Sequence, residues 1–313
     1  MMDIAVIGTG GIAQKAYFPL LAVMPEINIS AVLSRTQEHA NQAAERWAIP
    51  FATNKLDEIV ARQPRAALVI SSTESHFAIC KLLMENGVDV YVEKPLTTSS
   101  QQSQQLSQIA KNHSRILAVG FNRRYALLYQ QAKSILSNQK IELAVIKKHR
   151  TTASNPSLFE HYLDDTIHQI DLMRYYCGDV EAIQTTYQKA DGVLVTANST
   201  VKLPGGGMGT IMVCNQTGAW QESATIHTKG ISLHVDAFER LRVMHDGHET
   251  VYGTDRAGKW VTAMKERGFW GELDHFFDCV RTRETPQTSA QEALKTQRLM
   301  EDLVTAAGDP LPT

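Results

Sequence analysis

The sequence predicts an α/β protein made of a doubly wound parallel sheet, followed by an α+β domain with a large, mainly antiparallel sheet. Strand-like and helix-like runs alternate strictly up to residue 120, which favours parallel strands joined by helices. Beyond Val180 helical periodicity nearly vanishes, and short strand-like runs follow one another. We therefore place a boundary after residue 121 and assign residues 1–121 and 122–313 to two domains.

The composition is that of an ordinary globular protein whose partner is a small molecule. Of the 313 residues, 43% are hydrophobic and 20% are charged, enough for a core in each domain. The formal net charge of -2 offers no basic field for nucleic acid or an anionic membrane. A strand-like run begins at Ile4, leaving no room for a signal peptide, and no apolar stretch has membrane-spanning length. Four cysteines without C-x-x-C spacing fit reduced packing residues in a cytoplasmic protein: Cys80, Cys177, Cys214 and Cys279.

A glycine-rich turn lies between the first predicted strand, Ile4–Ile7, and a helix-like segment that Pro19 is expected to bend. In a dinucleotide-binding turn, Gly8 permits the tight turn, Gly10 lets the backbone approach a pyrophosphate, and the small Ala13 allows close packing. The helix amino terminus then faces the phosphates. A tight turn without any ligand explains the same pattern. The predicted cofactor residues here are Gly8, Thr9, Gly10, Gly11, Ile12 and Ala13.

The second predicted strand, Ile27–Leu33, ends in Ser34-Arg35-Thr36, where an NAD site usually places a carboxylate for the ribose hydroxyls. No acidic residue occupies these positions. Arg35 can pair with the 2′-phosphate of NADP, while Ser34 and Thr36 donate hydrogen bonds. We therefore expect NADP as the preferred cofactor, with NAD as the alternative. An exposed loop arginine is the simpler interpretation.

Strands and helices continue in turn through the rest of the first domain. The predicted elements are the helices Glu38–Trp47, Leu56–Ala61, Phe77–Glu85 and Ser99–Lys111 and the strands Ala66–Ser71, Val88–Val92 and Ile116–Gly120. Hydroxyl residues and a histidine follow the strand that ends at Ser71, at the edge where such sheets bind ligands. We therefore predict that Ser72, Thr73 and His76 lie at the cofactor. A local hydrogen bond at a helix start accounts for His76 equally well.

The apolar strand Val88–Val92 stops at Glu93-Lys94-Pro95. Since ligands collect at the carboxyl ends of strands in doubly wound sheets, Lys94 is a candidate for chemistry, and Glu93, Lys94 and Pro95 are predicted to contact the cofactor. Pro95 ends the strand and can hold a tight turn, cis or trans, that aims the lysine. A solvated strand end without function is the alternative.

A helix predicted from about Leu163 to Tyr176 carries ionisable residues, and Gly178 fits its end. At about 100° per residue, four side chains return to one side of it: Asp164, His168, Asp171 and Tyr175. The neighbouring apolar stripe, available for packing, is Leu163, Ile167 and Ile170. The polar side is either catalytic or a solvated helix face.

Strand-like runs dominate the segment after Val180, with the polar and apolar alternation of an antiparallel sheet. They are Ala182–Tyr187, Leu194–Lys202, Gly209–Cys214, Ser223–Thr228, Ile231–Val235 and Arg240–Met244. We interpret Pro204–Gly209 as a hairpin turn and not a phosphate loop, and His245–Glu249 as an Asp-Gly hairpin and not a metal site. Helices at Phe269–Thr282 and Ala290–Ala307, which can pack back on the first domain, are expected to bury Phe276, Phe277 and Leu299.

Three motifs together resemble the Gfo/Idh/MocA family of oxidoreductases in order and spacing. They are the glycine turn, Glu93-Lys94-Pro95 and Gly120-Phe121-Asn122-Arg123-Arg124-Tyr125. The downstream Asp-x-x-x-His of Asp164 and His168 fits the same pattern, so the resemblance covers nearly the whole chain. It implies a Rossmann domain, a mainly antiparallel sheet domain and NAD(P)-dependent dehydrogenation of sugars, polyols and related hydroxy compounds. The asparagine-arginine motif is similar to a virulence-factor-like branch whose substrates are poorly defined.

The resemblance also implies roles for single residues. It indicates that His168 reaches the substrate, that Asp164 binds substrate or orients the imidazole, and that Asp171 is structural. The catalytic candidates are Lys94, His168 and Asp164. The substrate candidates are Lys94, Arg123, Tyr125, Tyr162, Asp164 and His168, and Asn122 joins the cofactor candidates. Because family members associate through the outer face of the second sheet, we expect a homodimer or homotetramer.

The chain departs from the family just before and within the Asp164 helix. Family members usually carry glycines there, whereas this chain has Phe159-Glu160-His161-Tyr162 and Thr166. We therefore expect a narrower approach for the substrate. Glu160 and His161 are candidates for additional specificity contacts.

The mechanism that the resemblance implies is direct hydride transfer between nicotinamide and an alcohol carbon held by Lys94 and His168. With an ordinary pKa near 6.5, a histidine suits the general base, whereas a lysine near 10.4 suits hydrogen-bond donation to oxygen. The two roles can also be exchanged. The alternatives are a non-catalytic dinucleotide sensor, which retention of both residues argues against, and an enzyme using NAD transiently in elimination or glycoside cleavage.

Overall fold

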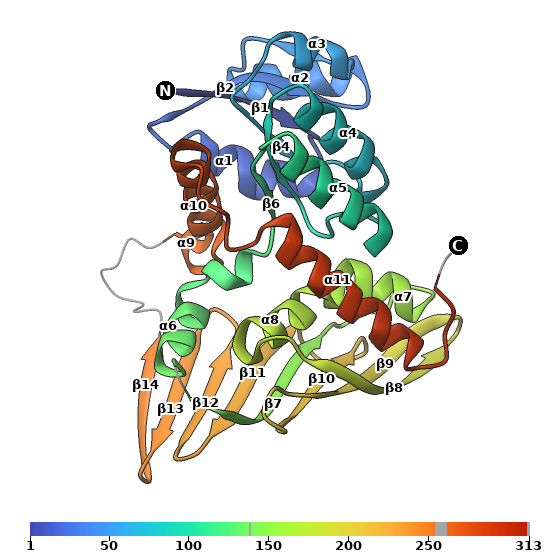
Figure 1. Cartoon of the computed structure of the whole chain (residues 1–313), viewed down its shortest axis with the longest axis vertical. Coiled ribbons are helices and arrows are strands. Elements are labelled where there is room, and N and C mark those ends of the chain that lie inside the picture. Colours follow the sequence, from blue (N-terminus) through green and yellow to red (C-terminus); the bar gives the residue numbers. More distant parts are fainter. Residues whose placement is uncertain (138, 254–261, 312–313) are drawn as a thin grey trace. The chain divides into compact units, whose positions relative to one another are not determined.

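The computed structural model describes residues 1–137, 139–253 and 262–311 (Figure 1). The chain divides into two compact units. The first comprises Met1–Phe121 and Phe269–Leu294, and the second comprises Asn122–Gly268 and Lys295–Thr313. The chain passes from the first unit to the second after Phe121, and the segment Phe269–Leu294 belongs to the first unit again.

Six parallel strands form the sheet of the first unit in the order β3-β2-β1-β4-β5-β6. The strands are β1 (Met2–Ile7), β2 (Ile27–Leu33), β3 (Ala52–Thr53), β4 (Ala66–Val69), β5 (Asp89–Val92) and β6 (Leu117–Val119). The order reverses at β1, so the carboxyl ends of β1 and β4 form the switch point where doubly wound sheets bind ligands. The predicted parallel, doubly wound sheet is confirmed.

Helices cover both faces of this sheet (Figure 1). They are the π-helix η1 (Ala13–Tyr17), α1 (Phe18–Leu21), α2 (Gln37–Trp47), α3 (Leu56–Ala61), α4 (Thr73–Glu85), α5 (Ser100–Asn112) and α10 (Phe269–Thr282). Side-chain oxygens of Thr36 and Ser99 cap α2 and α5, as such residues do at helix starts. The irregularity predicted near Pro19 takes the form of a wide π turn that leads directly into α1.

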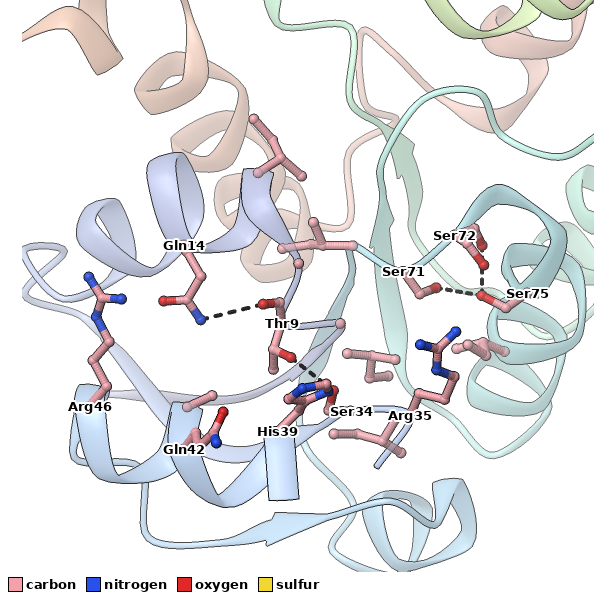
Figure 2. A pocket seen from close by; sticks show the side chains of 18 residues that line it. Thr9, Gln14, Ser34, Arg35, His39, Gln42, Arg46, Ser71, Ser72 and Ser75 are labelled. Atoms are coloured by element: carbon pink, nitrogen blue, oxygen red, sulfur yellow. Dashed lines mark hydrogen bonds between the residues drawn. The ribbon is translucent and has the colours of Figure 1, made fainter. Parts of the chain in front are cut away.

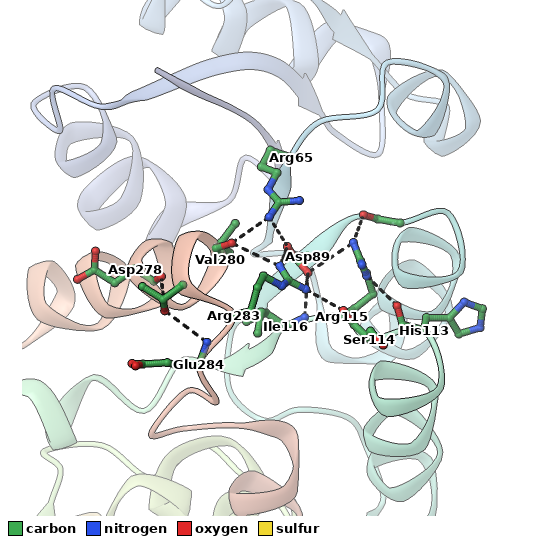
Figure 3. Close-up of polar contacts among 12 residues, drawn as sticks. Arg65, Asp89, His113, Ser114, Arg115, Ile116, Asp278, Val280, Arg283 and Glu284 are labelled. Atoms are coloured by element: carbon green, nitrogen blue, oxygen red, sulfur yellow. Dashed lines mark hydrogen bonds and ion pairs between the residues drawn. The ribbon is translucent and has the colours of Figure 1, made fainter.

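A buried carboxylate at the start of β5 ties α10 to the amino-terminal edge of the sheet (Figure 3). Asp89 is fully buried and accepts the backbone N–H of Ile116 at 2.9 Å. Arg283 donates to both Asp89 oxygens, at 2.5 and 3.1 Å, and Arg65 and Arg115 each lie 3.9 Å away. Arg65 also donates to the carbonyl oxygen of Val280 in α10 at 2.9 Å. One carboxylate therefore links two strands and a helix.

Eight strands form the sheet of the second unit in the order β14-β13-β12-β11-β7-β10-β9-β8. They are β7 (Ile141–His149), β8 (Glu181–Ala190), β9 (Val193–Lys202), β10 (Met208–Cys214), β11 (Gln221–Thr228), β12 (Ile231–Asp236), β13 (Arg240–His245) and β14 (His248–Gly253). Only β7 and β10 pair in parallel, which confirms a mainly antiparallel sheet. The sequence analysis missed β7, whose partners are distant in sequence and whose burial does not alternate regularly.

One face of this sheet is covered by helices and the other carries exposed apolar side chains. The remaining helical segments are η2 (Asn122–Tyr125), α6 (Leu127–Ile135), α7 (Leu158–His161), the π-helix η3 (Tyr162–Thr166), α8 (Ile167–Cys177), α9 (Ala263–Glu266) and α11 (Ala290–Thr305), which starts in the first unit. Of these, α6, α7 and α8 contact strands of the sheet directly. Ile146 of β7, Ile170 of α8 and Leu303 of α11 share one core. Leu299, Phe276 and Phe277 are buried as predicted.

Both predicted hairpin turns are confirmed. The glycine-rich segment after Leu203 connects β9 to β10, and Asp246-Gly247 connects β13 to β14 with positive φ angles of 49° and 75°. Gly178 ends α8 with a φ of 82°. None of the helices described here has the combination of length and apolar character that a membrane crossing needs.

Candidate functional site

The glycine turn is shaped by the close approach of β4. Gly8 has a φ of 106°, and a Cβ atom there would lie 2.4 Å from the carbonyl oxygen of Ile70 and 2.8 Å from the nitrogen of Ser71. Only glycine fits this position without moving the backbone. A Cβ atom at Gly10 or Gly11 would instead meet no atom within 4 Å. The turn is therefore tight on the strand side and open on the other.

A cavity of about 890 Å³ lies at this turn, at the carboxyl ends of β1, β2 and β4 (Figure 2). Figure 2 shows its polar side chains around the open space beside the turn. The lining residues come from the turn, from the end of β2 and α2, and from the end of β4 and α4. They are Ile7, Gly8, Thr9, Gly10, Ile12, Gln14, Leu33, Ser34, Arg35, His39, Gln42, Ala43, Arg46, Ile70, Ser71, Ser72, Ser75 and Ile79.

The cavity carries basic and hydroxyl side chains beside apolar ones, without a carboxylate among the described lining residues. The hydroxyls of Thr9 and Ser34 lie 2.8 Å apart, which joins the glycine turn to the end of β2. Arg35 and His39 are exposed at the end of β2 and the start of α2, and Arg46 lies in the last turn of that helix. This arrangement favours an anionic ligand.

The predicted cofactor residues are divided between the cavity and its surroundings. Those that line the cavity are Gly8, Thr9, Gly10, Ile12, Ser34, Arg35 and Ser72. Those of the first unit that do not line it are Gly11, Ala13, Thr36, Thr73, His76, Glu93, Lys94 and Pro95. Asn122 belongs to the second unit, where its side chain donates to the carbonyl oxygen of Arg267 at 2.8 Å.

Sequence reasoning missed several lining residues on α2. His39, Gln42 and Arg46 follow Arg35 at helical spacing, so they lie on the side of α2 that faces the cavity. The signal was present, because a helix starting just after Arg35 was predicted. The helix was not placed at the carboxyl end of β2, where one of its sides faces the ligand-binding edge of the sheet.

The segment at Lys94 is held by side chains on both sides. Glu93 accepts the backbone N–H of Lys94 at 2.9 Å, and the peptide bond between Lys94 and Pro95 is cis. His76 is buried, with Nδ1 3.0 Å from the carbonyl oxygen of Pro95 and Nε2 3.2 Å from that of Ser71. Burial lowers the pKa of His76, although these contacts oppose the shift. His76 therefore joins the ends of β4 and β5.

The helix predicted over Leu163–Tyr176 is interrupted by a π turn. The wide turn η3 precedes α8, so the regular 100° spacing does not apply between Asp164 and His168. Asp164 is exposed, whereas His168 is 6% and Asp171 1% exposed. The helix therefore does not present a single polar face, because Asp164 is exposed whereas His168 and Asp171 are buried. The alternative that the polar side is a solvated helix face does not hold for His168 and Asp171.

Asp171 has the structural contacts expected of it. Arg124 donates to its two oxygens at 2.8 and 2.6 Å, and the Thr296 hydroxyl donates at 2.9 Å. These bonds fasten α8 to η2 and to α11 within the second unit. Because Asp171, Arg124 and Thr296 are all buried, removal of the aspartate or the arginine would leave the other with an unpaired buried charge.

A second carboxylate with cationic partners, the half-buried Asp165, lies one residue after the predicted Asp164. The Nζ atom of Lys148 is 2.8 Å from an Asp165 oxygen and 2.8 Å from its carbonyl oxygen, and Arg150 donates to both carboxylate oxygens. Burial opposes ionisation of Asp165, but hydrogen bonds from Arg150 and the charge of Lys148 hold its pKa well below the usual value. Burial and the nearby charge of Arg123 lower the pKa of Lys148 to about 8. The end of β7 is therefore tied to η3.

The predicted substrate residues of the second unit are mostly engaged in its interior. Arg123 donates to both oxygens of the buried Glu222, each at 3.0 Å. Tyr125 is 6% exposed. Tyr162 is fully buried, and its hydroxyl lies 2.8 Å from that of Ser199 in β9. Tyr162 therefore points into the core of the second unit, whereas the sequence led us to expect that it narrows the path of the substrate.

Asp164 lines a polar cavity of about 350 Å³ in the second unit. His161 is 4% exposed and Asn215 1% exposed, so both present buried polar groups to this region. The side chain of Trp220 is 36% exposed. The lining residues are Arg150, Thr151, Thr152, Ser154, Asn155, His161, Asp164, Asp165, Asn215 and Trp220. His161 and Asp164 were among the predicted candidates. Sequence reasoning missed the lining residues that follow β7 because that strand was itself missed.

The glycine turn, the switch-point cavity and its basic lining define a dinucleotide-binding protein. The comparisons with known proteins agree. Residues 2–121 match the family model described as oxidoreductase family, NAD-binding Rossmann fold. The chain is 30% identical over 314 residues to "Putative oxidoreductase YceM" of Salmonella typhimurium, covering 96% of this chain and 97% of that protein. The chain belongs to the Gfo/Idh/MocA family of oxidoreductases.

More distant relatives extend over most of the chain. The scyllo-inositol 2-dehydrogenase (NAD(+)) of Bacillus subtilis is 25% identical over 303 residues, covering 90% of this chain and 87% of that protein. The crystal structure of the dehydrogenase MviM from Clostridium difficile has a TM-score of 0.89 at 26% identity, covering 98% of this chain and 99% of that one. The two-domain fold is therefore shared along the full length of the chain.

Proposed function

We propose that this protein is an NAD(P)-dependent dehydrogenase that transfers a hydride between nicotinamide and a hydroxyl or carbonyl carbon of a sugar, polyol or related small molecule. The observation that carries the proposal is the switch-point cavity at the glycine turn, basic and lined by no described carboxylate, in a chain of an oxidoreductase family. A relative named as an inositol dehydrogenase supports the substrate class. The free cysteines favour a cytoplasmic location.

NADP is the preferred cofactor in this proposal. Arg35 stands at the end of β2, where the ribose of a dinucleotide lies in this fold, and Ser34 beside it also lines the cavity. A guanidinium can bind the 2′-phosphate with two hydrogen bonds, whereas the NAD ribose has no such group. His39 adds a further nitrogen donor on the same side of the cavity (Figure 2).

We assign the chemistry of the substrate to Lys94, His168 and Asp164. A bound nicotinamide supplies the hydride acceptor for alcohol oxidation. Lys94 donates a hydrogen bond to the reacting oxygen, and His168 takes the hydroxyl proton; in carbonyl reduction the proton returns along the same path. Asp164 contacts the substrate from the polar cavity that it lines. Exchange of the roles of Lys94 and His168 is the alternative.

A homodimer or homotetramer formed through the open face of the eight-stranded sheet completes the proposal. Leu143 of β7 and Met208 of β10 are paired in register and are 40% and 42% exposed. Met212, on the same side of β10, is 36% exposed. Apolar side chains on neighbouring strands of a sheet face are typical of a surface that another subunit covers.

A substrate screen tests the function. Purified protein is incubated with inositol isomers, aldoses and sugar alcohols, separately with NAD and NADP, and reduced cofactor is followed by its absorbance. We expect cofactor reduction with at least one polyol or sugar, faster with NADP, and none with Lys94→Met despite unchanged cofactor binding. A protein that binds cofactor but oxidises no member and reduces no corresponding carbonyl compound would instead be a dinucleotide sensor. Substrate conversion without net cofactor reduction would indicate transient use of the cofactor.

A further inference from the structure

Two buried tyrosines, a buried glutamate and the half-buried Glu93 lie close together next to Lys94 in the first unit. Tyr17 comes from the end of η1 and Tyr91 from β5, and they are 0% and 1% exposed. Glu93 directly follows β5, and Glu272 of α10 is 2% exposed. None of these groups except Glu93 figured in the sequence predictions. Such a concentration of buried polar groups requires an explanation.

The hydrogen bond from Tyr17 to Glu93 has a defined direction. The Tyr17 hydroxyl donates to Glu93 Oε1 at 2.5 Å and lies 2.8 Å from the Tyr91 hydroxyl. A tyrosine has a single hydroxyl hydrogen, and Tyr17 gives its hydrogen to Glu93. The Tyr91 hydroxyl has both the Tyr17 hydroxyl and the Glu272 carboxylate as hydrogen-bond neighbours.

Both tyrosines remain protonated donors over the whole working range of pH. Burial raises the pKa of Tyr17 well above its ordinary value near 10, and the charge of Glu93 adds to this effect. Burial also raises the pKa of Tyr91, followed by the charges of Glu272 and Glu93. The hydrogen bond from Tyr17 to Glu93 is thus not interrupted by ionisation of the tyrosine.

Glu93 connects Tyr17 to the backbone of Lys94. Its Oε1 atom accepts from Tyr17, and its Oε2 atom accepts the backbone N–H of Lys94 at 2.9 Å. On the far side of the lysine, His76 lies 3.0 Å from the carbonyl oxygen of Pro95. The backbone around Lys94 is therefore held by Glu93 before the lysine and by His76 after it. Glu93 is in turn held by the side chain of Tyr17.

The surroundings of Tyr17 leave its hydroxyl little freedom. The Tyr17 ring meets Phe269 of α10 edge to face, with centroids 5.7 Å apart, and Tyr91 at 5.8 Å. A Cβ atom at Gly120 would lie 2.7 Å from the Tyr91 hydroxyl, so glycine leaves the space that this hydroxyl occupies. The π turn of η1 ends at Tyr17. Ring packing therefore sets the position of the hydroxyl that holds Glu93.

We propose that Tyr17 is a positioning residue for the reaction: through Glu93 it fixes the backbone of Lys94 and so aims the lysine side chain at the substrate. The inference rests on the role assigned to Lys94 in the proposed function. Misplacement of a reacting group by about 1 Å lowers turnover on the order of a hundredfold, so a positioning contact of this kind has a measurable effect.

The first test measures the Lys94 backbone directly and needs no substrate. Amide hydrogen exchange at Lys94 is followed by NMR in the full chain for wild type, Tyr17→Phe and Tyr187→Phe. Tyr187 is the matched control, because its hydroxyl also donates to a carboxylate, Asp309 Oδ1 at 2.7 Å, in the second unit. We expect exchange at least about tenfold faster in Tyr17→Phe and unchanged in Tyr187→Phe. Unchanged exchange in Tyr17→Phe would overturn the proposal.

The second test separates positioning from a general loss of structure. With a substrate from the screen, Tyr17→Phe is expected to lower kcat by about tenfold to a hundredfold and to leave the cofactor KM within about twofold. Tyr91→Phe retains the bond from Tyr17 to Glu93 and lowers kcat less. In a Glu93→Ala background, addition of Tyr17→Phe should change kcat no further, because Tyr17 acts through Glu93.

The outcomes distinguish this inference from the proposed function. Additive losses in the double variant would show that Tyr17 acts on stability and not through Glu93. If Lys94→Met is inactive while Tyr17→Phe has wild-type kcat and exchange, only the positioning role fails. If Lys94→Met is fully active, the assignment of Lys94 fails and the positioning role fails with it.

Discussion

Gly8 and Gly10 belong to the same turn, but the structure constrains them differently. The strained φ of Gly8 and the 2.4 Å approach to Ile70 make any side chain incompatible with the backbone. We expect Gly8→Ala to lower the free energy of unfolding by at least about 3 kcal/mol, measured by urea denaturation.

Gly10→Ala is the matched variant, because a methyl group there meets no protein atom within 4 Å. The free energy of unfolding should stay within about 1 kcal/mol of wild type. Dinucleotide affinity, measured by calorimetry, should fall at least about tenfold, because the methyl group takes the space of the approaching pyrophosphate. Equal losses of stability in Gly8→Ala and Gly10→Ala would contradict the assignment of Gly8 to the fold and of Gly10 to cofactor binding.

Arg35 is the residue on which the cofactor preference is expected to depend. Its loss removes charge-assisted hydrogen bonds to a 2′-phosphate, so Arg35→Ala should raise the KM for NADP by about tenfold to a hundredfold. The KM for NAD should change less than about threefold. The control is Arg62→Ala, since Arg62 packs on Phe51 and does not line the cavity. A parallel rise of both KM values in Arg35→Ala would show that Arg35 does not read the phosphate.

The attachment of α10 to the sheet depends on the carboxylate that begins β5. Asp89→Asn removes the negative charge shared by Arg283, Arg65 and Arg115 while keeping the shape of the side chain. We expect it to lower the free energy of unfolding by roughly 2 kcal/mol, because Arg283 loses charge-assisted hydrogen bonds to a fully buried carboxylate. Asp278→Asn, on the exposed side of α10, should change it by less than about 0.5 kcal/mol. Similar effects of the two substitutions would contradict a special role for Asp89.

The link from β7 to η3 makes stability depend on pH in a specific direction. The folded pKa of Lys148, about 8, is lower than its ordinary 10.5, so the unfolded chain binds this proton more tightly. Between these two values the unfolded state carries more protons, and wild-type stability therefore rises with pH. Below pH 8 the group is protonated in both states, and its contribution no longer varies.

A variant without the lysine should lack this dependence. Relative to Lys148→Met, wild type should gain about 3 kcal/mol between pH 7 and pH 10.5, measured by urea denaturation at each pH. Lys147→Met is the control, because Lys147 projects to the opposite side of β7, and its difference from wild type should be the same at every pH. A constant difference between wild type and Lys148→Met would contradict the lowered pKa.

At the scale of the whole molecule, the open face of the eight-stranded sheet is expected to hold subunits together. Leu143→Glu places a charge opposite Met208 on that face. We expect wild type to be a dimer or tetramer and Leu143→Glu to be a monomer by light scattering after gel filtration, because a buried unpaired charge opposes association. Val23→Glu, at an apolar residue of the first unit that is 63% exposed, should leave the assembly unchanged. A monomeric wild type would refute the proposed assembly.

The accuracy of the sequence-based prediction varied with the range of the interactions involved. The helix Leu56–Ala61 and the hairpin at Asp246-Gly247 were predicted correctly, because propensity and turn chemistry act over a few residues. The strand β7 was missed, although it lies inside the sheet, because its partners β10 and β11 follow much later in the chain. Among the candidate residues, Asp164 was predicted from its motif, whereas the half-buried Asp165 was not, because its cationic partners lie on β7 and just after it.

By itself the sequence determined the class of fold, the glycine turn and the strand end at Lys94. These are local patterns, and the steric demand of a turn or the burial of a strand acts on adjacent residues. Tertiary structure alone decided the basic lining of the cofactor cavity, the π turn before His168 and the bonds from Tyr17 through Glu93 to Lys94. The bond from Tyr17 to Glu93 joins groups that are distant in sequence and become neighbours only when the sheet and its helices pack.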